Sequence, residues 1–177
     1  MVALVDVDVL IGNEEDAKVF LAKKLELETK GEDLRKVYET ARENARLNGF
    51  DNVTFEAHNC FDLLRELTDA GEKYDLVILD PPAFTKNKAA VQSAIRGYKE
   101  INLRGLKLTR DGGFLVTCSC SQHVLPEMFQ DVICQAARDA KKRVRLVEYR
   151  TQGYDHPILP QSVETKYLKT MILQVFD

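Results

Sequence analysis

Short apolar runs alternate with longer segments of helical period along most of this 177-residue chain. The clearest run, LVIL at 76–79, is apolar throughout, as expected for a strand covered on both faces. This alternation favours an α/β fold with a doubly wound, mainly parallel sheet and helices on both faces. We expect strands at 2–11, 25–29, 53–57, 74–79, 113–118, 144–149 and 171–176, and helices at 13–24, 34–49 and 62–70, one ending near 108, and one over 126–140.

The charge is distributed unevenly along the chain. The net charge of −3 excludes a uniformly basic nucleic-acid binder, and the 45% of hydrophobic residues is enough for one globular domain over residues 1–177. Residues 1–80 hold 10 basic and 19 acidic residues, whereas residues 81–177 hold 15 and 9. A polyanionic partner such as RNA should therefore meet the second half of the chain.

Several classes of protein are disfavoured by simple patterns. No run reaches the roughly 18 apolar residues of a membrane span, so no membrane partner is expected. The start of the chain has no basic region of the kind that opens a signal peptide, and the four cysteines are scattered, so we expect a reduced, cytoplasmic monomer. Cys118, Cys120 and His123 come nearest to metal-binding spacing, but no fourth ligand is obvious and no metal site is predicted.

The end of the 74–79 strand is the first candidate site. Asp80 is followed by Pro81 and Pro82, which lack backbone N–H donors and leave the carboxylate among carbonyl acceptors. A ligand with a planar amine edge would complement such a group. The alternative is a rigid turn that contains an aspartate.

The end of the 113–118 strand carries two thiols, Cys118 and Cys120. Residues at i and i+2 point to the same face of an extended segment. A cysteine there can serve as a nucleophile if its pKa is lowered, although small buried thiols also serve for packing alone. A third candidate is His156, either as a general base, as a phosphate contact, or as a loop histidine held by Asp155.

From about residue 37 to residue 177, the chain resembles the catalytic domain of the RlmI-like family of S-adenosylmethionine-dependent methyltransferases. This family makes 5-methylcytosine in large-subunit ribosomal RNA, and its sheet is Rossmann-like. The matching stretches are ARENARLNG (41–49), NCFDLLRE (59–66), YDLVILDPPAF (74–84), RGYKEIN (96–102), GGFLVTCSCS (112–121) and GYDHPILPQSVETKYLK (153–169).

The resemblance implies roles for individual residues. Asn59 would lie beside the adenine of S-adenosylmethionine, and Asp80 with Pro81 would line the pocket for the cofactor and the target base. Cys118 would be the nucleophile that adds to C6 of cytosine, with Cys120 as the alternative. Glu32 or Asp33 falls near the acid that binds the cofactor ribose. Candidate contacts to the RNA backbone are the basic residues Lys86, Lys88, Arg96, Lys99 and Arg104, with a solvated helix face as the alternative for each.

The chain departs from this family at its start, because the glycine-rich turn that approaches the methionine part of the cofactor is missing. Residues 1–36 form an atypical strand-helix-strand unit in its place, and residues 5–20 resemble a segment of ribokinase-like 2-keto-3-deoxygluconate kinases. The acidic residues Glu14, Glu15 and Asp16 would repel the carboxylate of the cofactor. The alternative interpretation is therefore a recombined or engineered chimeric scaffold without catalytic activity.

Overall fold

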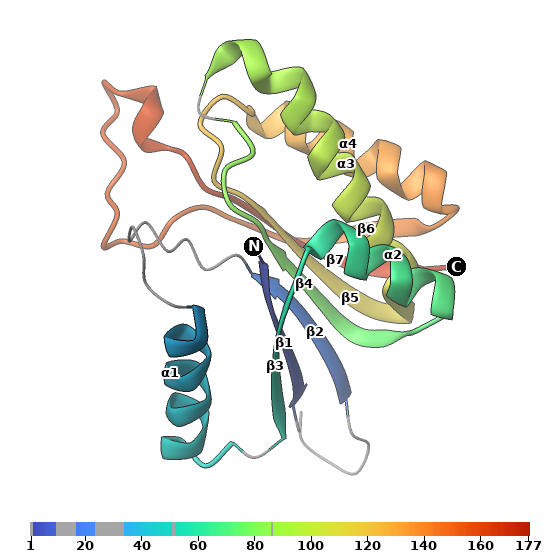
Figure 1. Ribbon diagram of the computed structural model, residues 1–177. Helices are drawn as coiled ribbons and strands as arrows, with labels where there is room; N and C mark the ends of the chain where they lie inside the picture. The colour runs from blue at the N-terminus through green and yellow to red at the C-terminus, as the bar shows by residue number, and fades with distance from the viewer. Residues whose placement is uncertain (1, 10–16, 24–33, 51, 86) are drawn as a thin grey trace.

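The computed structural model of this chain describes residues 2–9, 17–23, 34–50, 52–85 and 87–177 (Figure 1). Seven strands form one sheet in the order β3-β1-β2-β4-β5-β7-β6. The strands are β1 (Val2–Val9), β2 (Ala17–Lys23), β3 (Val53–His58), β4 (Tyr74–Asp80), β5 (Thr109–Ser119), β6 (Arg143–Arg150) and β7 (Lys169–Phe176).

Five of these strands, β2 to β6, point in the same direction, and β6 is among them because both β5 and β6 run antiparallel to β7. Strand β4 pairs in parallel with β2 and with β5, and β3 runs the same way because β1 lies antiparallel between β3 and β2. The carboxyl ends of β3, β2, β4 and β5 therefore meet at one edge of the sheet. Ligands of open α/β sheets bind at this kind of edge.

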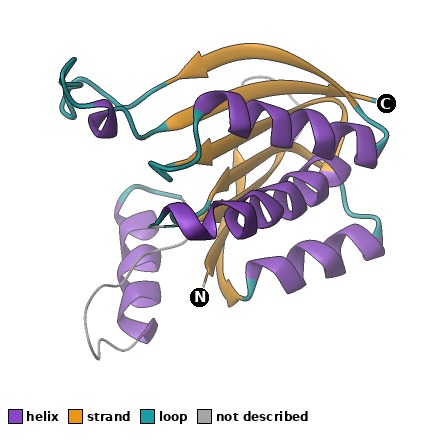
Figure 2. Cartoon of the chain, turned by 90° about the horizontal axis from the view of Figure 1, so that it is seen from above, coloured by secondary structure: helices purple, strands orange, loops and turns teal. Residues whose placement is uncertain are grey.

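Helices lie on both faces of the sheet. Three of them, α2, α3 and α4, stack side by side along one face (Figures 1 and 2). Helix α1 packs beside Val53 and Phe55 of β3. The strand register aligns Phe55 with Ile78 of β4, and both point to the face opposite α2, α3 and α4, so α1 covers that opposite face. The helices are α1 (Leu34–Leu47), α2 (Cys60–Ala70), α3 (Val91–Leu108) and α4 (Pro126–Ala140), with short 3-10 turns η1 (Lys88–Ala90) and η2 (Val163–Thr165).

The core lies between the sheet and the layer of α2, α3 and α4. Alternate residues of β4 and β5, such as Leu79 and Leu115, are fully buried there. Gly105 lets α3 approach these two leucines, because a Cβ at this position would lie 2.8 Å from Leu79 and 3.2 Å from Leu115. The ring of Tyr98 on α3 packs edge-on against Phe129 on α4, with 5.4 Å between ring centroids.

The expected α/β fold class is confirmed, and the sheet is mixed, because two of its seven strands run opposite to the other five. Strands β1 and β7 each pair antiparallel with both of their neighbours. The physical reason at β1 is the short connection over residues 10–16. Parallel neighbours need a crossover of a dozen residues or more, whereas antiparallel neighbours do not.

The predicted helix at 13–24 is wrong over its second half, which is strand β2. The helix was predicted from a local signal, an asparagine followed by three acidic residues at 13–16. These four residues lie outside the described residues. The segment from Val19 to Ala22 is apolar and pairs with β1 on one side and β4 on the other. Long-range pairing in the sheet therefore overrides the local helix signal. The strand expected at 25–29 lies outside the described residues.

Candidate active site

Asp80 and Cys118 lie side by side at the carboxyl edge of the sheet. Leu79 of β4 is in register with Thr117 of β5, so the next residues along these parallel strands, Asp80 and Cys118, are neighbours on the same face. Both side chains are half-buried. The prediction that the aspartate and a thiol share one edge is thus confirmed.

Asn59 stands at the same edge, directly after β3. It is the N-cap of α2, and its side-chain oxygen accepts a hydrogen bond from the backbone N–H of Phe61 at 3.1 Å. Capping satisfies a helix donor and holds the side chain in one orientation. The exposed amide of Asn59 is therefore fixed at the end of β3 by local structure.

The loop that follows Asp80 is held in place by its own side chains. The Thr85 hydroxyl donates to the carbonyl of Asn87 at 2.6 Å and accepts from the backbone N–H of Asn87 at 3.1 Å. Phe84 packs against Tyr98, with ring centroids 4.5 Å apart. The carbonyl of Pro81 is thereby presented to the end of β5.

The two candidate thiols contact different neighbours. Cys118 Sγ lies 3.5 Å from the hydroxyl of Thr170 on β7, whereas Cys120 Sγ lies 3.9 Å from the carbonyl oxygen of Pro81. The remaining cysteines differ from both. Burial raises the pKa of the Cys60 thiol to about 12, and Cys134 is exposed on α4.

A buried polar cluster around the turn that follows Cys120 was not predicted from the sequence. Lys169 is only 3% exposed, and its ammonium donates to the carbonyls of Ser121 at 2.7 Å and Val124 at 2.8 Å. The Tyr98 hydroxyl lies 2.9 Å from the Ser121 hydroxyl. Helical spacing predicted that Tyr98 faces inward, but no local pattern distinguishes a buried lysine from an exposed one at the start of a strand.

Burial of Lys169 should make the stability of the protein depend on pH. Burial lowers the pKa of this lysine from 10.5 to about 8, and the opposing effect of Cys120 is smaller. Below pH 8 the amine is protonated in both states, so the cost of burying the charge is present. Above pH 8 the folded protein releases the proton while the unfolded chain keeps it up to about pH 10.5, so stability rises.

We expect the free energy of unfolding of the wild type, relative to that of Lys169→Gln, to increase by about 2 kcal/mol between pH 7 and pH 9.5. Urea denaturation at several pH values measures this difference. A difference that stays constant over this range would contradict the assignment.

His156 lies in the exposed loop between β6 and β7. Its ring nitrogen Nε2 is 3.8 Å from the Asp155 carboxylate, and Nδ1 is 3.3 Å from the hydroxyl of Tyr167. The imidazole is well exposed at 61%. These contacts match the interpretation of a loop histidine held by its neighbouring aspartate.

The predicted phosphate contacts divide into paired and exposed side chains. Lys99 forms an ion pair with Asp139 at 2.7 Å, and Arg104 forms one with Glu100 at 3.2 Å, so their charges are partly offset within the protein. Lys88 and Arg96 are exposed. Lys86, Glu32 and Asp33 lie outside the described residues.

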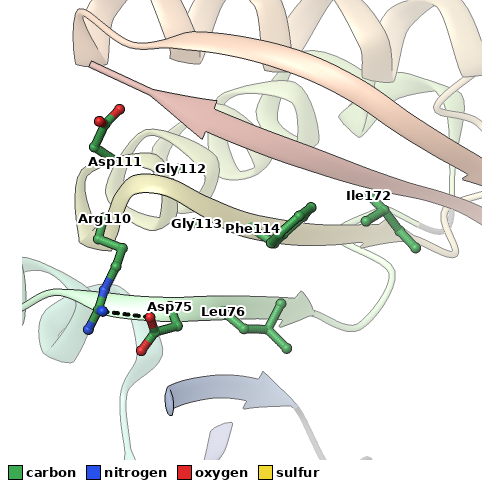
Figure 3. Close-up of a pocket in the computed structure, with 8 residues that line it drawn as sticks. All are labelled: Asp75, Leu76, Arg110, Asp111, Gly112, Gly113, Phe114 and Ile172. Carbon is green, nitrogen blue, oxygen red and sulfur yellow. Dashed lines mark ion pairs between the residues drawn. The ribbon is translucent and has the colours of Figure 1, made fainter. Parts of the chain in front are cut away.

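A surface hollow of about 480 Å³ lies at the opposite end of β4 (Figure 3). Phe114, Leu76 and Ile172 line its apolar part, and Arg110 pairs with Asp75 at 2.6 Å at one end. Because Asp75 is the second residue of β4 and Asp80 is the last, this hollow is separate from the candidate active site.

The described residues offer neither a metal cluster nor a membrane-spanning helix. Within the parts of the chain that the structure describes, no three histidine, cysteine or acidic side chains come together as a metal site would require. None of the helices described is both long enough and apolar enough to cross a membrane.

Comparison with known proteins identifies the family. The profile of the S-adenosylmethionine-dependent methyltransferase family matches residues 29–173. The chain belongs to this family. Ribosomal RNA large subunit methyltransferase I of Erwinia tasmaniensis is 41% identical over 139 residues, covering 77% of this chain and 35% of the relative. The chain thus spans about a third of the length of the curated relatives that it matches.

Solved structures confirm the Rossmann-like α/β fold of this methyltransferase chain. The crystal structure of SMU.776 complexed with SAH has a TM-score of 0.56 at 20% identity, covering 67% of this chain and 30% of that one. A methyltransferase homolog protein from Pyrococcus horikoshii has a TM-score of 0.55 at 18% identity, covering 80% and 50%. The cofactor of the family is S-adenosylmethionine, as the resemblance implied.

Proposed function

We propose that this chain methylates carbon 5 of cytosine in large-subunit ribosomal RNA. The observation that carries the proposal is the meeting of Asp80 with two thiols at the carboxyl edge of the sheet, Cys118 by register and Cys120 through Pro81. Pyrimidine C5 methylation needs a nucleophile beside a hydrogen-bond acceptor for the base. The name of the relative from Erwinia tasmaniensis supports the choice of RNA.

The donors and acceptors at this edge fit the nucleoside part of S-adenosylmethionine. Asn59 offers an amide at the end of β3, and Asp80 offers a carboxylate at the end of β4. An amide and a carboxylate are suited to the amine and hydroxyl groups of an adenosine. When bound, S-adenosylmethionine would supply an electrophilic methyl group and, as its S–CH₃ bond breaks, would leave as S-adenosylhomocysteine.

The thiol and the carboxylate have separate tasks in the proposed reaction. A cysteine thiolate adds to C6 of cytosine, forming an S–C6 bond and moving the electron pair of the C5–C6 double bond onto C5. After C5 carries the methyl group, a base removes the C5 proton and the S–C6 bond breaks, which restores the thiolate. Asp80 accepts a hydrogen bond from the exocyclic amine of the base.

The target cytosine must leave its stack to reach this edge. A base that reacts at C5 and C6 needs a single-stranded or flipped conformation. The exposed side chains of Lys88 and Arg96 are the candidate contacts for the flanking phosphates. Such contacts make RNA affinity decrease as salt concentration increases.

A second candidate is a chimeric scaffold without catalysis, which the antiparallel hairpin of β1 and β2 favours. This hairpin stands where the family has a glycine-rich strand-helix-strand unit. The proposed origin of residues 5–20 from a sugar kinase belongs to the same hypothesis. The two candidates differ in whether the chain binds S-adenosylmethionine.

Titration calorimetry with S-adenosylhomocysteine distinguishes the two candidates. We expect saturable heat and an increase in melting temperature, with no response to ATP, which controls for the resemblance to a kinase. A methyl-transfer assay on unmodified large-subunit ribosomal RNA should then yield 5-methylcytosine by mass spectrometry. No heat and no thermal shift at millimolar ligand would favour the inactive scaffold.

A further inference from the structure

The protein buries a positive charge close to one of its two candidate thiols. Lys169 is 3% exposed, and the hydrogen bonds of its ammonium go to the carbonyls of Ser121 and Val124. Among the residues that the structure describes, no carboxylate forms an ion pair with Lys169. Burying a charge without a counter-charge is costly, so such a residue calls for an explanation.

The ammonium holds the turn that follows Cys120. Residues 121–124 form a turn closed by a hydrogen bond from the Val124 N–H to the Ser121 carbonyl at 3.2 Å. From β7, the Lys169 ammonium donates hydrogen bonds to the first and last carbonyls of this turn, those of Ser121 and Val124. From α3, the Tyr98 hydroxyl forms a hydrogen bond with the Ser121 hydroxyl. The backbone that carries Cys120 is therefore anchored from two sides.

The position of Lys169 in the sheet separates Cys120 from Cys118. Lys169 is in register with Ser119, on the face that α3 and α4 cover, whereas Cys118 is in register with Thr170 and lies on the other face. Cys120 follows the end of β5 and reaches the carbonyl of Pro81. The charge of Cys120 raises the pKa of Lys169, so by reciprocity the ammonium favours the thiolate of Cys120.

We propose that Lys169 is a positioning residue that anchors the 121–124 turn and stabilises the Cys120 thiolate, which makes Cys120 the nucleophile of the site. The role in methyl transfer rests on the proposed function, but the stabilisation of the thiolate does not. With a pKa of about 8, Lys169 is still about nine-tenths protonated at pH 7 and can exert this effect there.

Lys169 and Tyr98 interact electrostatically with Cys120, and Asp80 lies one residue before Pro81, whose carbonyl Cys120 contacts. Lys169 approaches from β7 and favours the thiolate. The phenol of Tyr98 on α3 is neutral at physiological pH, since burial raises its pKa and the Ser121 hydroxyl only partly offsets this. Asp80 precedes Pro81 in the adjacent loop, and its negative charge opposes ionisation of the thiol. Of these groups, the ammonium of Lys169 is the one whose charge favours the thiolate of Cys120.

Alkylation of single cysteines by iodoacetamide tests the proposal without RNA or cofactor. The rate at each cysteine is followed by mass spectrometry from pH 5 to pH 10 in the intact chain. We expect the midpoint of Cys120 to lie at least about one pH unit below that of the exposed Cys134. Lys169→Gln, which keeps hydrogen-bond donors but removes the charge, should raise the midpoint of Cys120 by about one unit, a tenfold loss of rate near neutral pH.

Lys169→Arg, which keeps the charge, should preserve the low midpoint of Cys120, and Cys118 should not respond to either substitution. Equal midpoints for Cys120 and Cys134 in the wild type would overturn the proposal even if neither variant folds. An unchanged Cys120 profile in folded Lys169→Gln would also overturn it. A chain that transfers no methyl group but shows the expected profiles would refute the proposed function and leave this inference standing.

Discussion

Replacing Asp80 by asparagine should reduce methyl transfer to cytosine-containing RNA by about 100-fold or more, while the fold remains intact. The carboxylate stands at the end of β4 beside Cys118, and the two prolines that follow it contribute acceptors but no N–H donors. An amide at this position places an NH₂ group where the carboxylate accepted a hydrogen bond from the exocyclic amine of the base. The site then loses an acceptor and gains a repulsive donor.

The matched control for this substitution is Asp75→Asn at the other end of the same strand. Asp75 pairs with Arg110 at 2.6 Å, at a partly exposed position far along β4 from the active-site edge. We expect this variant to retain methyl transfer within about twofold and to lose little stability, because exposed ion pairs contribute at most about 1 kcal/mol. Equal activity of the Asp80→Asn and Asp75→Asn variants would exclude Asp80 from the reaction.

Truncating Phe129 to alanine should destabilise the protein by about 3–5 kcal/mol, the range observed for buried aromatic residues. Phe129 is fully buried on α4, and its ring packs edge-on against Tyr98 of α3. The substitution leaves a cavity where these two helices meet. A loss of this size is a large fraction of the total stability of an ordinary domain.

Urea denaturation measures this effect, and the adjacent Met128→Ala provides the control. Met128 is 37% exposed on the same helix, so its truncation should cost less than about 1 kcal/mol. The Phe129→Ala variant should also increase the alkylation rate of buried Cys60 if the loss of stability exposes the core more often. Similar urea midpoints for the two variants would show that the helix interface is not closely packed at Phe129.

Strong local patterns predicted the second half of the fold well. The strands expected at 74–79, 144–149 and 171–176 correspond to β4, β6 and β7 within a few residues. A period of two residues in strands and of 3.6 residues in helices reflects burial of one face, which is a local property of a sequence. The edge shared by Asp80 and Cys118 followed from the same reasoning, because the residues after parallel strands collect at one end of a sheet.

The first quarter of the chain shows where local reasoning failed. Residues 17–23 form a strand because β1 and β4 offer it partners on both sides, although the residues before it favour the start of a helix. The orientation of β1 likewise depends on the length of its connection to β2 and not on its own alternation of apolar and acidic residues. Pairing between distant segments is not encoded in the pattern of either segment alone.

The sequence by itself determined the order of most elements, the family, and the presence of a carboxylate and two thiols at strand ends. Only the tertiary structure revealed that a lysine 49 residues beyond Cys120 is buried against the turn that follows this thiol. Only the structure likewise showed that Lys99 and Arg104 form ion pairs within the protein. Backbone periodicity reports which side of an element faces the core, whereas the partner of a charged side chain depends on how separate elements pack. For this reason, the methyltransferase family was predictable from sequence motifs, whereas the proposed choice between the two thiols depends on the fold.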